Sequence, residues 1–196
     1  MGVAYDGDGD RCLAVDENGN EIDGDKIMAI ISSSLRKKGK LAKDTIVATV
    51  MSNLGLNKYA RDNGLELLQT KVGDRYVLEE MLKDGFNLGG EQSGHVILLD
   101  YNPTGDGILT SLMLIKSILE ENKKASQMAQ MVKLYPQVLV NAKVNSEKKY
   151  GFKDDKEIKN AIEKLEKEFA GNGRVLIRPS GTEPLVRVCL LYTSPS

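Results

Sequence analysis

Three aspartates alternate with glycines near the start of the chain, in a loop between two short apolar segments. The loop covers residues 6–11, and its carboxylates belong to Asp6, Asp8 and Asp10. Glycine lets the backbone turn so that such carboxylates can point inward together, and carboxylates this close repel one another unless a cation neutralises them. The spacing therefore predicts a site for one hard divalent cation, with a solvated acidic turn as the plainer alternative.

A calcium-binding EF-hand is another interpretation of the same loop. The three aspartates and Glu17 fall at the first, third, fifth and twelfth positions of that motif. Its sixth position requires glycine but is Arg11 here, and the flanking residues alternate like strands where the motif needs helices. We therefore reject the EF-hand.

A glycine-rich loop at residues 89–95 carries a second set of polar side chains. Its sequence is Gly-Gly-Glu-Gln-Ser-Gly-His, and it lies between two short apolar segments. Glu91 can accept hydrogen bonds, and Ser93 can both donate and accept them, which suits the hydroxyl groups of a sugar. A hairpin turn with His95 satisfied in the core is the alternative, and the residues alone favour neither.

A charged turn at residues 71–75, Lys-Val-Gly-Asp-Arg, comes between an expected strand and an expected helix. Lys71 would be able to titrate or to bind phosphate if it were buried. A solvated helix start, with Asp74 in the first turn, is the plainer interpretation of this segment.

A turn at residues 178–184, Arg-Pro-Ser-Gly-Thr-Glu-Pro, is followed three residues later by another arginine. Arg178 and Arg187 offer paired donors of the kind that bind phosphate. The alternative is a proline-bounded turn whose arginines lie on a solvated sheet face. The phosphate interpretation is favoured because backbone amides at the tip add dipoles directed at an anion, namely those of Ser180, Gly181 and Thr182.

The elements that position these loops follow from the periodicity of apolar residues. Up to about residue 131, short apolar runs typical of strands alternate with segments of helical spacing. One of these segments carries Ile108, Leu109, Leu112, Ile115 and Leu119. Such alternation is typical of an α/β layer. Beyond about residue 132, a strand-like run, an amphipathic segment at 154–169 and two further strands predict a small α+β unit.

The bulk composition is ordinary for a globular protein and excludes several classes of function. Of the 196 residues, 41% are hydrophobic and 28% are charged, and the net charge of −1 leaves no basic excess for binding nucleic acid or an anionic membrane. No apolar run approaches the ~20 residues of a membrane span, and no signal pattern opens the chain. Cys12 and Cys189 lie in apolar segments, so we expect buried thiols in a reducing, cytoplasmic compartment.

In this order, the loops resemble those of the α-D-phosphohexomutase superfamily, whose four domains each contribute one loop to a central cleft. Residues 6–11 are similar to the metal loop of the second domain, and residues 90–95 to the sugar loop of the third. Residues 178–184, together with Arg187, are similar to the phosphate loop of the fourth.

The resemblance covers residues 2–188 and is closest to the branch that acts on glucosamine phosphates, because residues 47–53 and 71–77 look most like that branch. It implies an enzyme that interconverts glucosamine 6-phosphate and glucosamine 1-phosphate through a bisphosphorylated sugar, with a phosphoserine as donor. A phosphomannomutase or phosphoglucomutase, and a non-catalytic phosphosugar-binding module, stay open as alternatives.

The resemblance also implies a role for each loop. The three aspartates would hold one Mg²⁺ per active site, Arg11 would add positive charge beside it, and Lys71 would be a general acid or base. The sugar would be bound by Glu91, Ser93 and His95. The phosphate that is not reacting would be held by Arg178, Ser180, Gly181, Thr182 and Arg187.

The expected organisation is that of a C-terminal fragment, inactive alone, whose partners are a phosphosugar and the missing N-terminal domains. Residues 1–20 would end the second domain, 21–131 would form a complete α/β mixed-sheet third domain, and 132–196 a small α+β, TATA-binding-protein-like fourth domain. We expect the final strand at residues 185–190, followed from Tyr192 by a polar stub. After Val188 the sequence departs from the family pattern.

Overall fold

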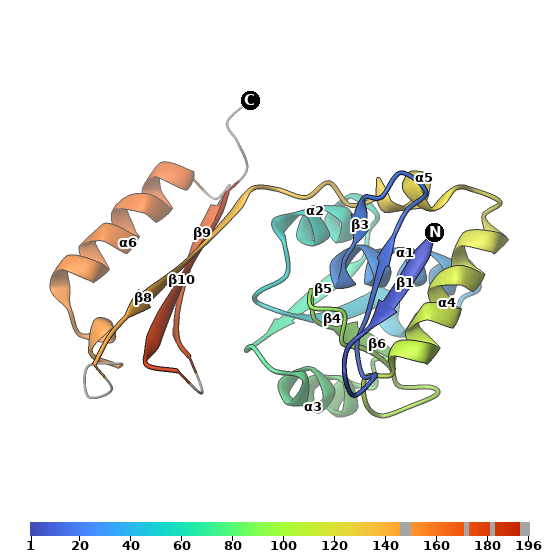
Figure 1. The fold of residues 1–196 in the computed structure, drawn as a ribbon, viewed down its shortest axis with the longest axis horizontal. Helices are drawn as coiled ribbons and strands as arrows, with labels where there is room; N and C mark the ends of the chain where they lie inside the picture. Colours follow the sequence, from blue (N-terminus) through green and yellow to red (C-terminus); the bar gives the residue numbers. More distant parts are fainter. Residues whose placement is uncertain (146–149, 171–172, 181–182, 193–196) are drawn as a thin grey trace. The chain divides into compact units, whose positions relative to one another are not determined.

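The computed structural model describes residues 1–145, 150–170, 173–180 and 183–192. The chain divides into two compact units, Met1–Lys133 and Leu134–Ser196 (Figure 1). The first contains both the expected remnant at residues 1–20 and the expected α/β domain.

The first unit opens with a small antiparallel sheet. Its strands are β1 (Gly2–Tyr5), β2 (Cys12–Val15) and β3 (Glu21–Ile22), paired in the order β1-β2-β3. The turn between β2 and β3 is closed by Asp16, whose carboxylate accepts hydrogen bonds from the backbone amides of Asn18 and Asn20 at 2.8 and 2.9 Å. The turn between β1 and β2 is the acidic loop.

A second sheet of four strands forms the centre of the first unit. The strands are β4 (Thr45–Thr49), β5 (Glu66–Thr70), β6 (Leu88–Gly90) and β7 (Val96–Leu98), and their order is β5-β4-β6-β7. β4 is parallel to β5 and β6, whereas β7 is antiparallel to β6. The mixed α/β sheet predicted from the sequence is confirmed.

Helices cover both faces of this sheet. Ile46 and Ala48 of β4 belong to a large core on one face, while Val47 packs with Met81 and other residues on the opposite face, because successive strand residues point to opposite sides. Figure 1 shows α3 across the sheet from α1 and α2. The helices are α1 (Gly24–Lys37), α2 (Leu54–Asp62), α3 (Asp74–Asp84), α4 (Gly107–Glu120) and α5 (Ala125–Ala129), with a 3₁₀ turn η1 (Ala42–Asp44).

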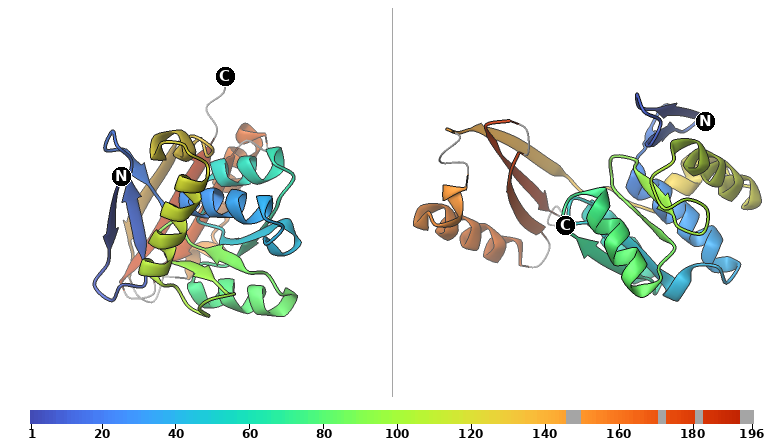
Figure 2. Two further views of the ribbon diagram at one scale, coloured as in Figure 1. Left: turned by 90° about the vertical axis from the view of Figure 1, so that its right-hand side faces the viewer. Right: turned by 90° about the horizontal axis from the view of Figure 1, so that it is seen from below.

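Helix α4 exists where apolar spacing predicted it, but three of the five apolar residues that gave the prediction face outward, while Leu109 packs against the core. Ile108, Leu112 and Leu119 are 62%, 60% and 72% exposed. The buried side includes Leu114 and the small residue Ser117, and it packs against α1. Figures 1 and 2 show α4 beside β1, and the Tyr5 hydroxyl lies 2.8 Å from Ser111 Oγ.

The second unit is a three-stranded antiparallel sheet with one long helix, so the predicted small α+β unit is confirmed. The strands pair in the order β8-β10-β9. Asp155 caps the helix by accepting hydrogen bonds from the amides of Glu157 and Ile158. The elements are β8 (Gln137–Lys143), a 3₁₀ turn η3 (Gly151–Lys153), α6 (Lys156–Phe169), β9 (Gly173–Pro179) and β10 (Leu185–Tyr192).

The prediction for the end of the last strand was wrong. β10 continues through Leu191 and Tyr192. Leu191 is fully buried, and the Tyr192 ring stacks on Phe169 with 6.1 Å between centroids. Packing of an aromatic pair therefore extends the strand where composition alone suggested a polar stub, whose remaining residues, 193–196, lie outside the described part of the chain.

The two cysteines are free and buried, as expected from the sequence. Burial raises the pKa of both the Cys12 and the Cys189 thiol. Among the described residues, no helix combines the length and the apolar character needed to cross a bilayer.

Candidate functional site

The acidic loop brings its three carboxylates together. One oxygen each of Asp6, Asp8 and Asp10 lies within 4.8 Å of the others. Gly9 has a φ of 73°, which allows its amide to turn back onto Asp6 O at 3.3 Å. Among the described residues, Oδ1 of Asp10 is buried and accepts no hydrogen bond. A set of converging carboxylate oxygens with one unused acceptor fits a hard divalent cation.

Arg11 contributes both a backbone and a side-chain contact to this loop. Its amide donates to Asp6 Oδ1 at 3.2 Å, and its Nε lies 3.9 Å from both Asp6 Oδ2 and Asp10 Oδ1. Removal from water acts to raise the pKa of Asp6, but hydrogen bonds, first that from the Arg11 amide, bring it below its ordinary value. These hydrogen bonds therefore favour the charged form of the Asp6 carboxylate.

The acidic loop is held by backbone contacts from two other segments. The amide of Gly107, the first residue of α4, donates to Gly9 O at 2.9 Å, and the Cys12 amide donates to Gly94 O at 3.1 Å. A Cβ on Gly107 would lie 2.5 Å from Arg11 O. Only glycine permits an approach this close, so the start of α4 and the 89–95 loop are fitted directly against the acidic loop.

The 89–95 loop rests on the N-terminus of α1. The Gly24 amide donates to Gln92 O at 2.9 Å, and a Cβ on Gly24 would lie 2.0 Å from Glu91 O. Ser93 is exposed and Glu91 is half-buried, with Ser93 Oγ 3.5 Å from Glu91 Oε2. Both side chains are therefore available to the hydroxyl groups of a ligand.

The charged turn at residues 71–75 is joined to this loop. The Gly73 amide donates to Glu91 Oε1 at 3.2 Å, which fixes the orientation of that carboxylate. Lys71 is exposed, and its Nζ lies 5.8 Å from the centroid of the Tyr76 ring. The condition of burial under which Lys71 was expected to titrate is not met, although its turn is bonded to the 89–95 loop through Gly73.

His95 is buried beneath the loops, with 3% of its surface exposed. Its Nδ1 lies 3.1 Å from Asp10 Oδ2, and its Nε2 accepts a hydrogen bond from the Gly105 amide at 3.2 Å. Asp74 Oδ2 is 3.8 Å from the same Nε2. Both ring nitrogens thus face groups of the protein, as in the core-histidine interpretation of the sequence.

The sequence analysis did not assign three residues that contact the site, Gly105, Gly107 and Asp74. Gly105 and Gly107 belong to the stretch Thr-Gly-Asp-Gly at residues 104–107. Its alternation of glycine with aspartate repeats the pattern of the acidic loop and was a usable signal. Asp74 was seen, but only as the start of a helix.

The arginine loop lies in the second unit. Arg178 of β9 and Arg187 of β10 are direct cross-strand partners, and the Nε atom of each is buried without a hydrogen-bond partner in the described chain. Arg187 also contacts Glu183 Oε2 at 3.1 Å. Ser180 is buried, and its amide is bonded to Leu185 O. The other two residues predicted here, Gly181 and Thr182, lie outside the described residues.

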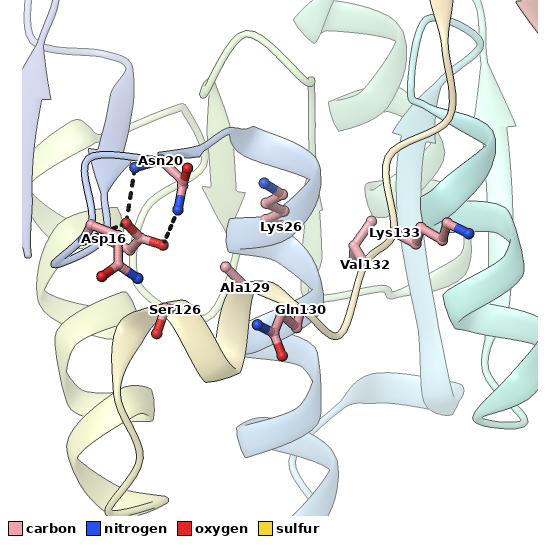
Figure 3. Close-up of a pocket in the computed structure, with 9 residues that line it drawn as sticks. Asp16, Asn20, Lys26, Ser126, Ala129, Gln130, Val132 and Lys133 are labelled. Carbon is pink, nitrogen blue, oxygen red and sulfur yellow. Dashed lines mark hydrogen bonds between the residues drawn. The ribbon is translucent and has the colours of Figure 1, made fainter.

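A pocket of about 520 Å³ in the first unit lies elsewhere, between the β2–β3 turn and α5 (Figure 3). Its lining includes Lys26, Lys133 and Asp16, and no residue predicted for the site is part of it. The Asp16 carboxylate is already used by its own turn, since it also accepts from the Asn20 side chain. We therefore place the candidate site in the first unit at its four bonded segments, which are the acidic loop, the 71–75 turn, the 89–95 loop and the stretch 104–107 at the start of α4.

The mixed sheet, the small α+β unit and the joined loops define the class as that of the phosphohexomutases. Residues 23–135 match the family model "Phosphoglucomutase/phosphomannomutase, alpha/beta/alpha domain III". Residues 139–190 match the model of the C-terminal domain of the same family. The chain belongs to the phosphoglucomutase/phosphomannomutase family, which confirms the resemblance seen in the sequence.

Curated relatives indicate which branch of the family the chain is most similar to. The chain is 61% identical over 190 residues to the phosphoglucosamine mutase of Ruminiclostridium cellulolyticum, and 60% identical over 188 residues to that of Ligilactobacillus salivarius. These matches cover 97% and 96% of this chain, which spans 42% and 41% of the length of those proteins.

Solved structures show the shared fold. Aspergillus fumigatus N-acetylphosphoglucosamine mutase, in complex with GlcNAc-6P and magnesium, matches with a TM-score of 0.78 and 21% identity, over 98% of this chain and 45% of that one.

Proposed function

We propose that this chain provides the metal-binding, sugar-binding and phosphate-binding loops of a phosphoglucosamine mutase, which interconverts glucosamine 6-phosphate and glucosamine 1-phosphate. The observation that carries the proposal is the direct bonding of the acidic loop, the 71–75 turn and the 89–95 loop into one assembly. The naming of the 60–61% identical relatives supports the choice of substrate.

The acidic loop would hold Mg²⁺. Asp6, Asp8 and Asp10 supply hard oxygen donors, and the unused Oδ1 of Asp10 fits a cation that the loop is built to accept. When bound, the cation would stabilise negative charge on a phosphoryl group in transfer. Arg11 lies beside the same carboxylates and adds positive charge there.

The 89–95 loop would bind the sugar. Glu91 is held by the Gly73 amide through Oε1, so that Oε2 and the neighbouring Ser93 hydroxyl can bond sugar hydroxyls. Lys71 is exposed on the adjoining turn, where its ammonium group can donate a proton to a sugar or phosphate oxygen.

The arginine loop would bind the phosphate that does not react. Like charges on directly opposed strand residues are unfavourable, so the pairing of Arg178 with Arg187 favours an anion on that face. The guanidinium fork matches phosphate oxygens in pairs.

Titration of the ¹⁵N-labelled chain tests the proposal. We expect Mg²⁺ to move the amide signals of Gly7 and Gly9, and glucosamine 6-phosphate to move those of Gly73 and Ser93. The variant Asp8→Asn should lose the response to Mg²⁺. Asp62→Asn is the matched control, because Asp62 is paired with Lys58 on α2, outside the joined loops.

Two results would contradict the proposal. One is the absence of any response in the acidic loop while the chain stays folded. The other is a phosphosugar response confined to the pocket of Figure 3, seen at the amides of Asn18 and Asn20.

A further inference from the structure

We propose that His95 is a positioning residue for the metal loop, whose Nδ1–H holds Oδ2 of Asp10 so that Oδ1 is presented to the cation. The inference rests on the proposed function in one respect, the binding of a divalent cation by the acidic loop. It concerns how this chain prepares one ligand for that cation.

The bonding partners of the ring define its tautomer. A backbone amide can only donate, so the Gly105 amide requires Nε2 to be an acceptor without a proton. A neutral imidazole then carries its proton on Nδ1. This proton points to Asp10 Oδ2 at 3.1 Å, so that His95 donates and the carboxylate accepts.

The ring has little freedom to take another orientation. His95 is 3% exposed, and its carbonyl accepts from the Glu91 amide at 2.9 Å, which closes the 89–95 loop. A Cβ on Gly105 would lie 2.5 Å from Nε2. The backbone of Gly105 thus packs directly against the imidazole, and the absence of a side chain is what allows the amide to reach it.

The two carboxylate oxygens of Asp10 therefore have different roles. Oδ2 is occupied by His95, while Oδ1 is buried and accepts no hydrogen bond from the described residues. A carboxylate anchored through one oxygen loses rotational freedom, so less entropy remains to be lost when the other oxygen binds a cation. Groups that orient metal ligands in this way change metal affinity by roughly tenfold to a hundredfold.

Two substitutions separate this role from simple packing. In His95→Asn the side-chain amide places an N–H donor at the position of Nδ1, whereas in His95→Gln the side-chain carbonyl oxygen can lie at the position of Nε2 and accept a hydrogen bond. Positioning of Asp10 requires the donor at Nδ1, and satisfying the Gly105 amide requires the acceptor at Nε2. We expect Mn²⁺ affinity, measured by calorimetry, to stay near that of the unmodified chain in His95→Asn and to fall roughly tenfold or more in His95→Gln.

NMR of the unmodified protein can determine the tautomer of His95 directly, without depending on whether a variant folds. The chain has a single histidine, so ¹⁵N labelling of histidine gives one imidazole to assign. We expect Nδ1 to carry the proton and Nε2 to be bare before any cation is added. The Nε2–H tautomer would overturn the inference.

The calorimetric outcomes distinguish the positioning role of His95 from the proposed binding of a cation by the acidic loop. Cation binding that is weakened equally in both variants, with unchanged melting temperatures, overturns the positioning role and leaves the metal site standing. Absence of Mn²⁺ binding in the folded, unmodified chain overturns the proposed metal function, and the positioning role with it.

Discussion

Gly94 shows how closely the loops are fitted at a single residue. Its φ is +94°, and a Cβ there would lie 2.4 Å from Cys12 O, the residue that begins β2. An L-residue with a side chain is strained at this φ, and the backbone it would meet cannot shift without disturbing the strand. The glycine is therefore required where the 89–95 loop meets the start of β2, directly after the acidic loop.

Gly94→Ala tests this fit. We expect a loss of about 1–3 kcal/mol in the free energy of unfolding, the usual cost of backbone strain at such a position. Gly7→Ala is the matched control, because its Cβ would meet nothing within 4 Å. Urea unfolding measures both variants, and equal stabilities would show that the two loops are not packed as described.

The sequence could predict the convergence of the three carboxylates in the acidic loop because they are local neighbours. Their convergence depends only on glycines within the same six residues, 6–11. The contact between His95 and Asp10 joins positions 85 residues apart, and no local pattern encodes it. Lys71 illustrates the same limit, since its exposure depends on how the strand before it and the helix after it pack.

At the scale of elements, Glu17 joins the β2–β3 turn to α5. Its carboxylate accepts hydrogen bonds from the Ser126 hydroxyl and from the Ser126 amide. The hydrogen bond from the Ser126 side chain is the main reason why the pKa of Glu17 lies below its ordinary value. Helix α5 spans five residues, too few to be stable in isolation, so this contact helps to hold it in place.

This lowered pKa gives a pH dependence with a defined sign. A carboxyl whose pKa is lower in the folded than in the unfolded chain stabilises the fold above its unfolded pKa, here 4.5, and that contribution is lost as the pH falls through the folded pKa. We expect Glu17→Gln to reduce the difference in unfolding free energy between pH 7 and pH 3.5. Glu66→Gln, on β5, is the control, and an equal effect of the two substitutions would contradict the role of Glu17.

Helix α4 and strand β10 show what periodicity can and cannot predict about an element. Both exist where the sequence places them. In α4 apolar residues occupy most of the circumference, so the pattern predicts a helix without saying which side is buried. In β10 the end of the strand depends on the stacking of Tyr192 on Phe169, a contact between distant segments.

At the scale of the whole molecule, exposed apolar side chains gather on two neighbouring elements of the first unit. On α4 these are Ile108, Leu112 and Leu119, and on β1 they include Val3 and Tyr5. Proteins rarely leave such surfaces exposed without a partner. We propose that the remainder of a phosphoglucosamine mutase covers this face, with residues 1–20 completing a second phosphohexomutase domain.

The division of the chain after Lys133 fits the proposal that the chain carries separate domains of a larger phosphoglucosamine mutase. Each unit has its own sheet, and the predicted boundary near residue 132 stays a proposal for the complete enzyme. In the first unit the acidic loop and the 89–95 loop are bonded to one another, while the second unit carries the paired arginines. An enzyme of this kind would need both units and a phosphoryl donor for turnover.

The most direct test of the central claim is an activity measurement on a fusion protein. The part of the Ruminiclostridium cellulolyticum phosphoglucosamine mutase that this chain does not match is joined to residues 1–196, with the complete relative as positive control. We expect the fusion to convert glucosamine 6-phosphate to glucosamine 1-phosphate in the presence of Mg²⁺, and to prefer it to glucose or mannose phosphates. The chain alone should give no turnover, and Asp8→Asn should abolish that of the fusion. A folded fusion without activity, or one that Asp8→Asn leaves unchanged, would contradict the account.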